Sequence, residues 1–169
     1  MKKLIVVAML VTLGVAALYA AEAAKDKVLL VNDFENDADK DMFKDSTASI
    51  EVSDQHATHG KHSLKVTWEG NKPLSALATM PGDWSKYKWF KFDLFNDGPD
   101  TNFTVRVRDG NGKGYDVWQY PVPQGASTIT LNLETAKGNI DLSKVTQFFM
   151  YLVDEGKATG FVDNVRLEP

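Results

Sequence analysis

The chain has 169 residues, no cysteine, and a formal net charge of −4 from 19 lysines and arginines against 23 acidic residues. A chain without cysteine has neither a disulfide framework nor a thiol nucleophile. A mildly acidic chain without a basic stripe also argues against a nucleic-acid-binding protein.

The first residues have the order of a secretory signal peptide. Lys2 and Lys3 precede an apolar run over residues 4–20, and small alanines follow it. We expect residues 1–23 to be removed, which leaves a secreted or periplasmic protein free of the membrane. Its charge is then −5, with 17 basic and 22 acidic residues, because two lysines and Glu22 are lost. The apolar run is nearly long enough to cross a bilayer, so an uncleaved anchor is the alternative.

The rest of the chain, residues 28–169, alternates between short β-rich runs and turn clusters such as Asp109-Gly110-Asn111-Gly112 and Pro123-Gln124-Gly125. Short helical turns are expected over 37–44 and 133–138. About nine regularly spaced strands in one domain predict an all-β fold, a two-sheet antiparallel β-sandwich of jelly-roll type. The predicted strands are 28–31, 49–53, 63–68, 89–95, 103–107, 115–122, 128–133, 147–153 and 161–167.

Acidic residues accompany both the first and the last predicted strand. Glu35 follows the first and Asp163 lies within the last. A carboxylate among apolar residues is costly unless something pairs with it. If the two strands are neighbours, Glu35 and Asp163 predict a shared structural calcium ion, with Asp33 or Asp54 as further ligands. The alternative is that each carboxylate accepts hydrogen bonds from turn amides.

Three histidines, His56, His59 and His62, have a spacing of three that is compatible with zinc. Gly60 interrupts the segment, however, and a strand begins at Ser63. The rings need not converge on an extended loop, so we favour a solvated loop.

The strand positions opposite the core predict a ligand-binding surface. These positions combine aromatic rings with Arg, Asp and Gln, whereas an ordinary solvent-facing strand carries Thr, Lys, Glu and Ser. Sugars stack their C–H faces on flat rings and hydrogen-bond to planar polar groups. The alternative is that several rings fill the core. The set comprises Trp89, Lys91, Asp93, Phe95, Arg106, Arg108, Tyr115, Trp118, Tyr120, Gln147, Phe149 and Tyr151.

Three segments, 59–67, 84–96 and 141–167, resemble jelly-roll carbohydrate-binding modules of the galactose-binding-like superfamily. The shared texts are His59-Gly60-Lys61-His62-Ser63-Leu64-Lys65-Val66-Thr67, Trp84-Ser85-Lys86-Tyr87-Lys88-Trp89-Phe90-Lys91-Phe92-Asp93-Leu94-Phe95-Asn96, Asp141-Leu142-Ser143-Lys144-Val145 and Phe161-Val162-Asp163-Asn164-Val165-Arg166-Leu167. The resemblance implies the jelly-roll fold and a structural calcium at Glu35 and Asp163. It also implies a glycan lying across a concave sheet, on Trp89, Asp93, Arg106, Arg108, Trp118 and Tyr151. Such modules are usually joined to a glycosidase, whereas this sequence carries no catalytic domain.

We therefore expect a secreted, monomeric and non-catalytic carbohydrate-binding module for a poly- or oligosaccharide such as β-glucan. The alternative is a protein-interaction or assembly domain of the cell envelope without a glycan ligand. A hydrolase would need two carboxylates facing each other across a cleft. The candidates near the aromatic positions, Asp93, Asp109 and Asp116, lie in no motif that requires this role.

Overall fold

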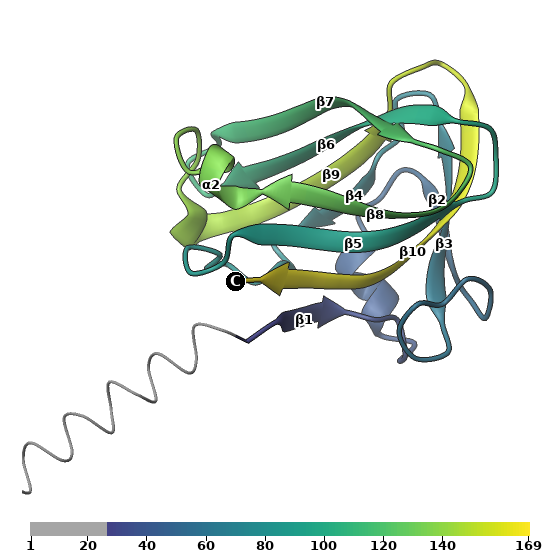
Figure 1. The fold of residues 1–169 in the computed structure, drawn as a ribbon, viewed down its shortest axis with the longest axis horizontal. Helices are drawn as coiled ribbons and strands as arrows, with labels where there is room; N and C mark the ends of the chain where they lie inside the picture. The colour runs from purple at the N-terminus through teal and green to yellow at the C-terminus, as the bar shows by residue number, and fades with distance from the viewer. Residues whose placement is uncertain (1–26) are drawn as a thin grey trace, which may run out of the picture.

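The computed structural model describes residues 27–169, and the predicted signal peptide over residues 1–23 lies outside the described residues. Within this range, ten strands form two antiparallel sheets that pack face to face (Figure 1). The strands are β1 Leu29–Asn32, β2 Ser49–Ser53, β3 Ser63–Glu69, β4 Leu74–Leu77, β5 Trp89–Asn96, β6 Thr101–Asp109, β7 Gly114–Val122, β8 Gly125–Asn132, β9 Val145–Leu152 and β10 Lys157–Glu168. The same residues contain no helix that is both long and apolar enough to cross a membrane.

Sheet A has the strand order β2-β3-β10-β5-β8, with β1 also paired to β10. The 12-residue strand β10 pairs with β3 along its first half, with β1 along its last residues, and with β5 along most of its length. The pairing of the first and last strands is confirmed, since Leu29 lies opposite Leu167. The C-terminus therefore lies beside β1 (Figure 1).

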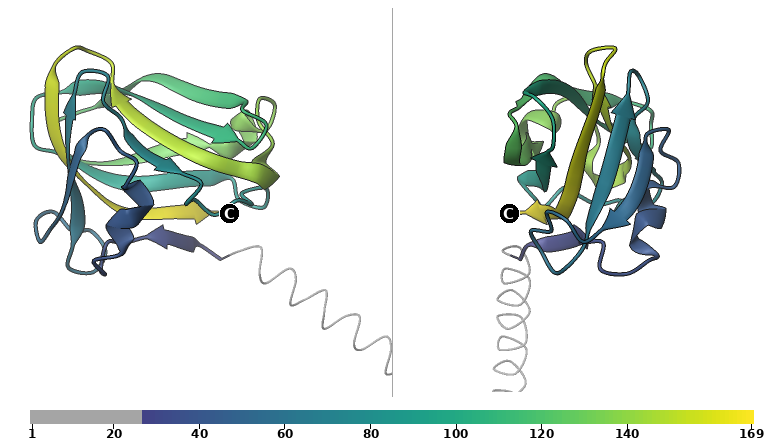
Figure 2. Two further views of the ribbon diagram at one scale, coloured as in Figure 1. Left: turned by 180° about the vertical axis from the view of Figure 1, so that it is seen from behind. Right: turned by 90° about the vertical axis from the view of Figure 1, so that its right-hand side faces the viewer.

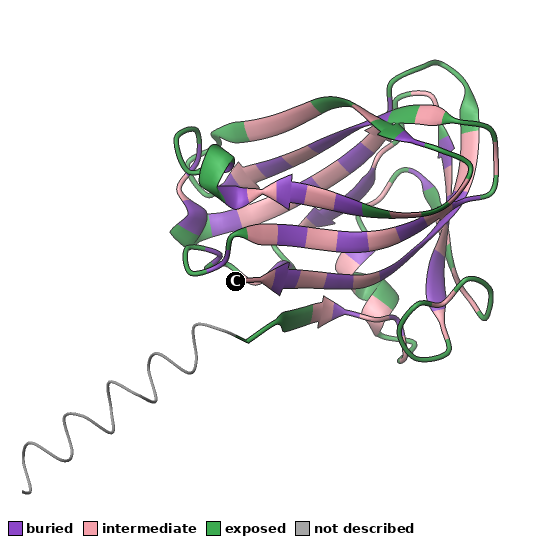
Figure 3. Cartoon of the chain, viewed as in Figure 1, coloured by how far each residue is buried: buried purple, intermediate pink, exposed green. Residues whose placement is uncertain are grey.

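Sheet B has the order β4-β9-β6-β7. The core lies between the two sheets, and buried and half-buried residues alternate along β5 (Figure 3). The fully buried Trp68 of β3 donates its indole N–H to the backbone oxygen of Met150 on β9, at 3.1 Å, so a core side chain also links the two sheets. The two antiparallel sheets, with their buried side chains between them, confirm the predicted all-β sandwich.

Each open side of the sandwich is closed by a different device. The short 3₁₀ helix η1 (Asp39–Phe43) contacts both β2 and β4, which are the edge strands on one side (Figure 2). On the other side, the Tyr120 hydroxyl of β7 accepts a hydrogen bond from the backbone N–H of Thr130 on β8, at 3.2 Å. These contacts hold the two sheets together at their edges.

The predicted strands are all present, and β4 is the strand that the sequence did not reveal. Its four residues, Leu74–Leu77, show no alternation because the first three are buried. The predicted helical turns correspond to η1 and to α2 (Leu133–Ala136), and a further 3₁₀ turn, η2, spans Leu142–Lys144.

The segment after Asp109 is a tight turn between β6 and β7, as predicted. Asp109 is buried, and its carboxylate accepts backbone N–H groups from Asn111, Lys113 and Asp141 at 2.9, 3.0 and 2.9 Å. The hydrogen bond from the Asp141 amide is the main cause that lowers the pKa of Asp109. Gly112 has a φ of +80°, which glycine adopts without strain. Asp109 is therefore a structural residue of the turn.

Candidate functional site

The six predicted ligand-binding residues lie on two opposite faces of the sandwich. Four of them, Arg106, Arg108, Trp118 and Tyr151, belong to sheet B, whereas Trp89 and Asp93 belong to β5 in sheet A. The prediction that these groups gather on one surface is wrong. The chain passes from sheet A to sheet B between β5 and β6, so outward positions on consecutive strands face away from each other.

On the outer face of sheet B, Arg106 is the best-fixed side chain. It lies opposite Asp116 on β7 and donates from Nε and Nη2 to that carboxylate, with Nη2 and Oδ2 2.8 Å apart. The hydrogen bond to Asp116 is also the main cause that raises the pKa of Arg106. The guanidinium carbon lies 6.0 Å from the ring centre of Trp118 and 5.9 Å from that of Tyr151, within cation–π range. A planar cation is thus held between two aromatic rings.

Trp118 and Tyr120 point to opposite sides of sheet B because β7 contains a β-bulge. The register between β6 and β7 shifts between Phe103 and Val105, and Gln119 has a φ of 52° in the left-handed region. Trp118, two residues after the outward Asp116 and 63% exposed, points to solvent, while Tyr120 turns inward. Tyr115 and Tyr120 both pack against the core, so placing them on the ligand face was wrong.

Beside these rings lies a groove of about 310 Å³, which we call the sheet B groove. Its floor comes from β6 and β9, where Arg108 lies 5.6 Å from the ring centre of Phe149. Its wall comes from Asn71 and Pro73 in the loop that joins β3 to β4. The lining residues are Asn71, Pro73, Arg106, Arg108, Phe149 and Tyr151.

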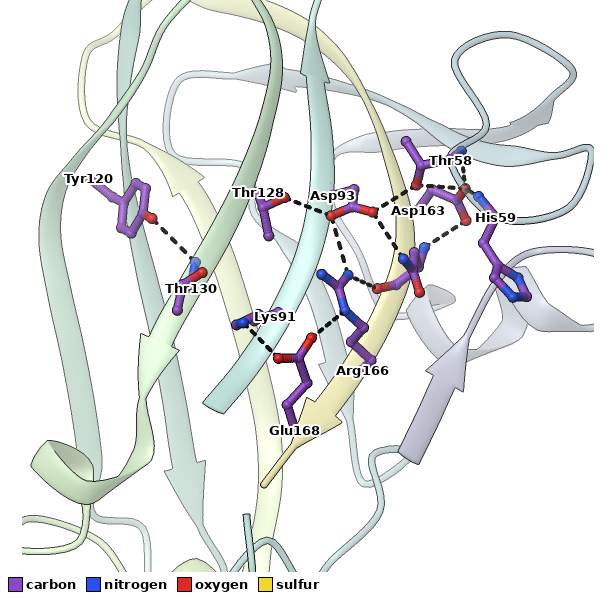
Figure 4. A network of polar contacts seen from close by, with 11 residues as sticks. Thr58, His59, Lys91, Asp93, Tyr120, Thr128, Thr130, Asp163, Arg166 and Glu168 are labelled. Carbon is purple, nitrogen blue, oxygen red and sulfur yellow. Dashed lines mark hydrogen bonds and ion pairs between the residues drawn. The ribbon is translucent and has the colours of Figure 1, made fainter. Parts of the chain in front are cut away.

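The outer face of sheet A is different because Asp93 is saturated with hydrogen bonds (Figure 4). Oδ2 accepts from Thr58 Oγ1 at 2.8 Å and from Asn164 Nδ2 at 3.0 Å, and Oδ1 accepts from Thr128 Oγ1 at 2.9 Å and Arg166 Nη1 at 3.2 Å. Burial alone would raise the pKa of Asp93, but these hydrogen bonds and the Arg166 charge lower it. Since the protein itself fills its acceptor positions, the geometry favours a structural role for Asp93.

Trp89 is also engaged within sheet A. It is half-buried, and the Lys91 ammonium lies 5.9 Å from its ring centre. Lys91 in turn forms an ion pair of 2.6 Å with Glu168, which also accepts a hydrogen bond from Arg166 at 2.8 Å. Trp89 therefore borders a polar network that is closed within the protein.

Glu35 and Asp163, the predicted calcium ligands, both hold the loop over residues 54–62. Glu35 Oε1 accepts the backbone N–H groups of Lys61 and His62 at 2.6 and 2.7 Å, and these bonds lower its pKa. Asp163 Oδ2 accepts those of Thr58 and His59 at 2.6 and 2.8 Å, although burial raises the pKa of Asp163. This is the alternative considered from the sequence, carboxylates bonded to turn amides.

A calcium ion at these two carboxylates stays a prediction. Most of the carboxylate lone pairs already face N–H donors, and Asp33, a predicted further ligand, lies 3.2 Å from His59 Nδ1. Within residues 27–169 no group of three or more His, Cys, Asp or Glu side chains gathers to hold a metal ion. A Cβ atom at position 60 would lie 2.3 Å from Glu35 Cδ. Only a glycine at this position therefore allows the loop to approach the Glu35 carboxylate so closely.

The three histidines of this loop have separate partners. His56 stacks on Phe95 with ring centres 3.5 Å apart, whereas His59 contacts Asp33 and His62 Nδ1 lies 3.7 Å from Glu35. His56 and His59 are exposed, in keeping with the predicted solvated loop, and the stacking of His56 on Phe95 anchors that loop on sheet A.

Sequence reasoning placed Asp116 near the aromatic positions but missed its pairing with Arg106, and it missed Asn71 and Pro73 altogether. The pairing could have been found by counting outward from the turn at Asn111, because Arg106 and Asp116 are equally distant from it. Asn71 and Pro73 carry no such signal, since they lie in a loop whose course depends on the unrecognised strand β4.

Comparisons with known proteins identify the fold. No protein-family model and no curated protein matches the sequence. Among solved structures, the family 11 carbohydrate-binding module from Clostridium thermocellum, in complex with a β-1,3-1,4-mixed-linked tetrasaccharide, has a TM-score of 0.63 and 16% identity, over 83% of this chain and 95% of that one. An exo-β-agarase matches with a TM-score of 0.64 and 22% identity, over 83% of this chain but only 24% of the agarase.

Other similar structures agree with these. The family 11 module of the cellulosomal cellulase Lic26A-Cel5E from the same organism has a TM-score of 0.61 and 15% identity, over 85% of this chain and 95% of that one. At these identities the similarity establishes the fold. The resemblance seen in the sequence is confirmed at that level, because the chain has the jelly-roll β-sandwich fold that carbohydrate-binding modules share.

Proposed function

We propose that the protein is a non-catalytic carbohydrate-binding module that binds a poly- or oligosaccharide along the outer face of sheet B. The observation that carries this proposal is the Arg106 guanidinium, which Asp116 fixes between the exposed ring of Trp118 and the half-buried ring of Tyr151. Aromatic rings stack on the apolar faces of sugars, and the guanidinium N–H groups not used by Asp116 can donate to hydroxyls.

The ligands named for the similar structures support this class of ligand. The family 11 module binds a mixed-linked tetrasaccharide, and a xylanase fragment with a family 22 module, at a TM-score of 0.56, is described in complex with xylohexaose. We infer a β-linked polysaccharide such as β-glucan. The groove is open, and water competes for each hydroxyl, so we expect dissociation constants on the order of 10 µM to 1 mM.

The acidic residues support binding without catalysis. A glycoside hydrolase needs two carboxylates on either side of the scissile bond. Asp116 is engaged by Arg106, Asp109 by turn amides, and Asp93 by four donors on the opposite face. The residues that line the sheet B groove include no carboxylate.

We further propose that the mature protein is secreted or periplasmic and acts as a monomer. The signal-like N-terminal sequence supports export, and an extracellular polysaccharide would be accessible there. The sheet B groove is complete within one chain, so a second copy is not required for binding.

Affinity electrophoresis through gels that contain mixed-linkage β-glucan, xylan or agarose tests the proposal. Retention by at least one polysaccharide is expected, with loss in Trp118→Ala. Trp89→Ala is the matched control, because it removes the same side chain from sheet A and should leave retention unchanged once melting confirms that it folds. Retention that is lost equally in both variants would reject the sheet B face. If no polysaccharide retained the protein and another protein stably co-purified with it, the alternative of an assembly domain would be favoured.

A further inference from the structure

Two arginines on β6 share the outer face of sheet B but have different partners. Arg106 lies opposite Asp116, and the two form an ion pair. Arg108, two residues further along, lies opposite Gly114 on β7 and Gln147 on β9. No carboxylate of residues 27–169 forms an ion pair with Arg108.

The surroundings of Arg108 orient its charge without neutralising it. The guanidinium carbon lies 5.6 Å from the ring centre of Phe149, which attracts the cation through its π face but carries no net charge. The other residues that line the sheet B groove are polar but uncharged, apolar, or already paired. The groove therefore holds one uncompensated positive charge, although the whole chain has a net charge of −4.

A guanidinium is suited to an anion that carries two oxygens in one plane or on one face. Its N–H groups form a rigid fork that matches carboxylates and sulfate-like oxyanions with paired hydrogen bonds. Gly114 lies directly across from Arg108 on β7 and has no side chain that could pair with this fork.

We propose that the sheet B groove prefers an anionic polysaccharide, whose sugars carry carboxylate or sulfate groups, and that Arg108 binds the anion. This inference rests on the function proposed above. Arg106, already neutralised by Asp116, serves the uncharged hydroxyls, while Arg108 selects for charge. The net negative charge of the chain does not oppose this at short range, because physiological salt screens charges beyond about 8 Å.

Isothermal titration with three forms of one backbone tests the inference: neutral mixed-linkage β-glucan, its carboxymethyl derivative and its sulfated derivative. At about 50 mM salt, we expect at least one anionic form to bind about tenfold more tightly than the parent. The two anionic arms distinguish carboxylate from sulfate recognition. Raising the salt to about 0.5 M should reduce this preference several-fold, because ions screen the attraction.

The variants Arg108→Gln and Arg108→Lys separate charge from shape. Arg108→Gln should abolish the preference for the anionic forms, so that the ratio of anionic to neutral affinity falls from about ten to about one. Arg108→Lys should keep part of the preference, and it also serves if the glutamine variant fails to fold. Equal binding of all three polymers, or an undiminished preference in Arg108→Gln, would overturn the inference while leaving Trp118-dependent glycan binding intact. No binding of any form would instead overturn the proposed function.

Discussion

The outer faces of the two sheets carry similar residue types, but the polar side chains of sheet A are paired with one another, whereas part of those on sheet B lack a partner within the described part of the chain. On sheet A, Asp93, Arg166 and Glu168 use their polar atoms on one another and on nearby hydroxyls and amides (Figure 4). On sheet B, the ring of Trp118 is largely exposed, and Arg108 has no anionic partner among residues 27–169. One face stabilises the protein, and the other remains available to a ligand.

The difference arises from cross-strand neighbours rather than from the strands themselves. Asp93 lies between Asp163 on β10 and Thr128 on β8, and the loop over residues 54–62 adds Thr58 from above. Arg108 lies between a glycine and a glutamine. An arginine or an aspartate on a strand is therefore informative about function only when its partners on both sides are known.

The largest expected effect is on sheet A. Replacing Asp93 with alanine removes the acceptor that Arg166, Asn164 and two threonine hydroxyls share, which should lower the free energy of unfolding by about 3 kcal/mol. Urea unfolding measures this. Thr128→Val removes only one donor and should cost about 1 kcal/mol. Glycan binding by the folded fraction should not change, and a large loss of affinity in Asp93→Ala would contradict the separation of the two faces.

Calcium comes next, because it would reinforce the loop that covers sheet A. If Glu35 and Asp163 bind calcium, the ion at a hundred times its dissociation constant adds about 2.7 kcal/mol to the stability. EDTA should then lower the melting temperature of the wild type but not that of Glu35→Gln. A melting temperature that ignores EDTA in the wild type would leave both carboxylates as acceptors for the loop amides alone.

On sheet B, removing Asp116 tests whether a fixed guanidinium matters. Asp116→Ala releases Arg106 from its ion pair, and polysaccharide affinity should fall about tenfold, or about 1.4 kcal/mol. The free energy of unfolding should change by less than about 1 kcal/mol, since the pair is partly exposed. Titration calorimetry and urea unfolding give the two values. Unchanged affinity would show that the rings suffice without a positioned cation.

The smallest expected effect is on pH dependence. The pKa of Asp93 is lowered, so its charged form adds stability above the unfolded value of about 3.9, and this is lost as pH falls through the folded pKa. The pKa of Asp163 is raised, so its contribution is present below the unfolded value and is lost as pH rises through the folded pKa. Asp93→Asn should reduce the loss of stability on acidification below about pH 4, by on the order of 1 kcal/mol. Unfolding at a series of pH values measures the slope, and an unchanged slope would contradict the assignment.

The sequence predicted the fold well because strand alternation and turn residues are local signals. The core positions of β5 and β6 follow directly from their alternation, and the turn at Asp109 follows from its glycines. The pairing of β1 with β10 entered only as the condition for a calcium site shared by Glu35 and Asp163, and the structure shows that the two strands are neighbours. β4 escaped because a short strand buried at most of its positions has no alternation.

The candidate site was predicted only in part because it depends on which sheet each strand joins. Outward alternation correctly placed Arg106, Arg108 and Tyr151 away from the core, but it could not show that β5 lies in the other sheet. The bulge at Gln119 also turns Tyr120 inward, and no residue type near Gln119 predicts a bulge at this position. Sheet membership and bulges are long-range properties that a single sequence does not display.

The central place of β10 has a consequence for how the chain acquires its structure. The strand β10 pairs with β1, β3 and β5, so residues far along the chain form the middle of a sheet whose other members come much earlier. Contacts of such long sequence separation slow folding. Sheet A therefore cannot be completed until residues 157–168 have joined it, and a variant that lacks them would leave β1 and β3 without the strand that joins them to β5.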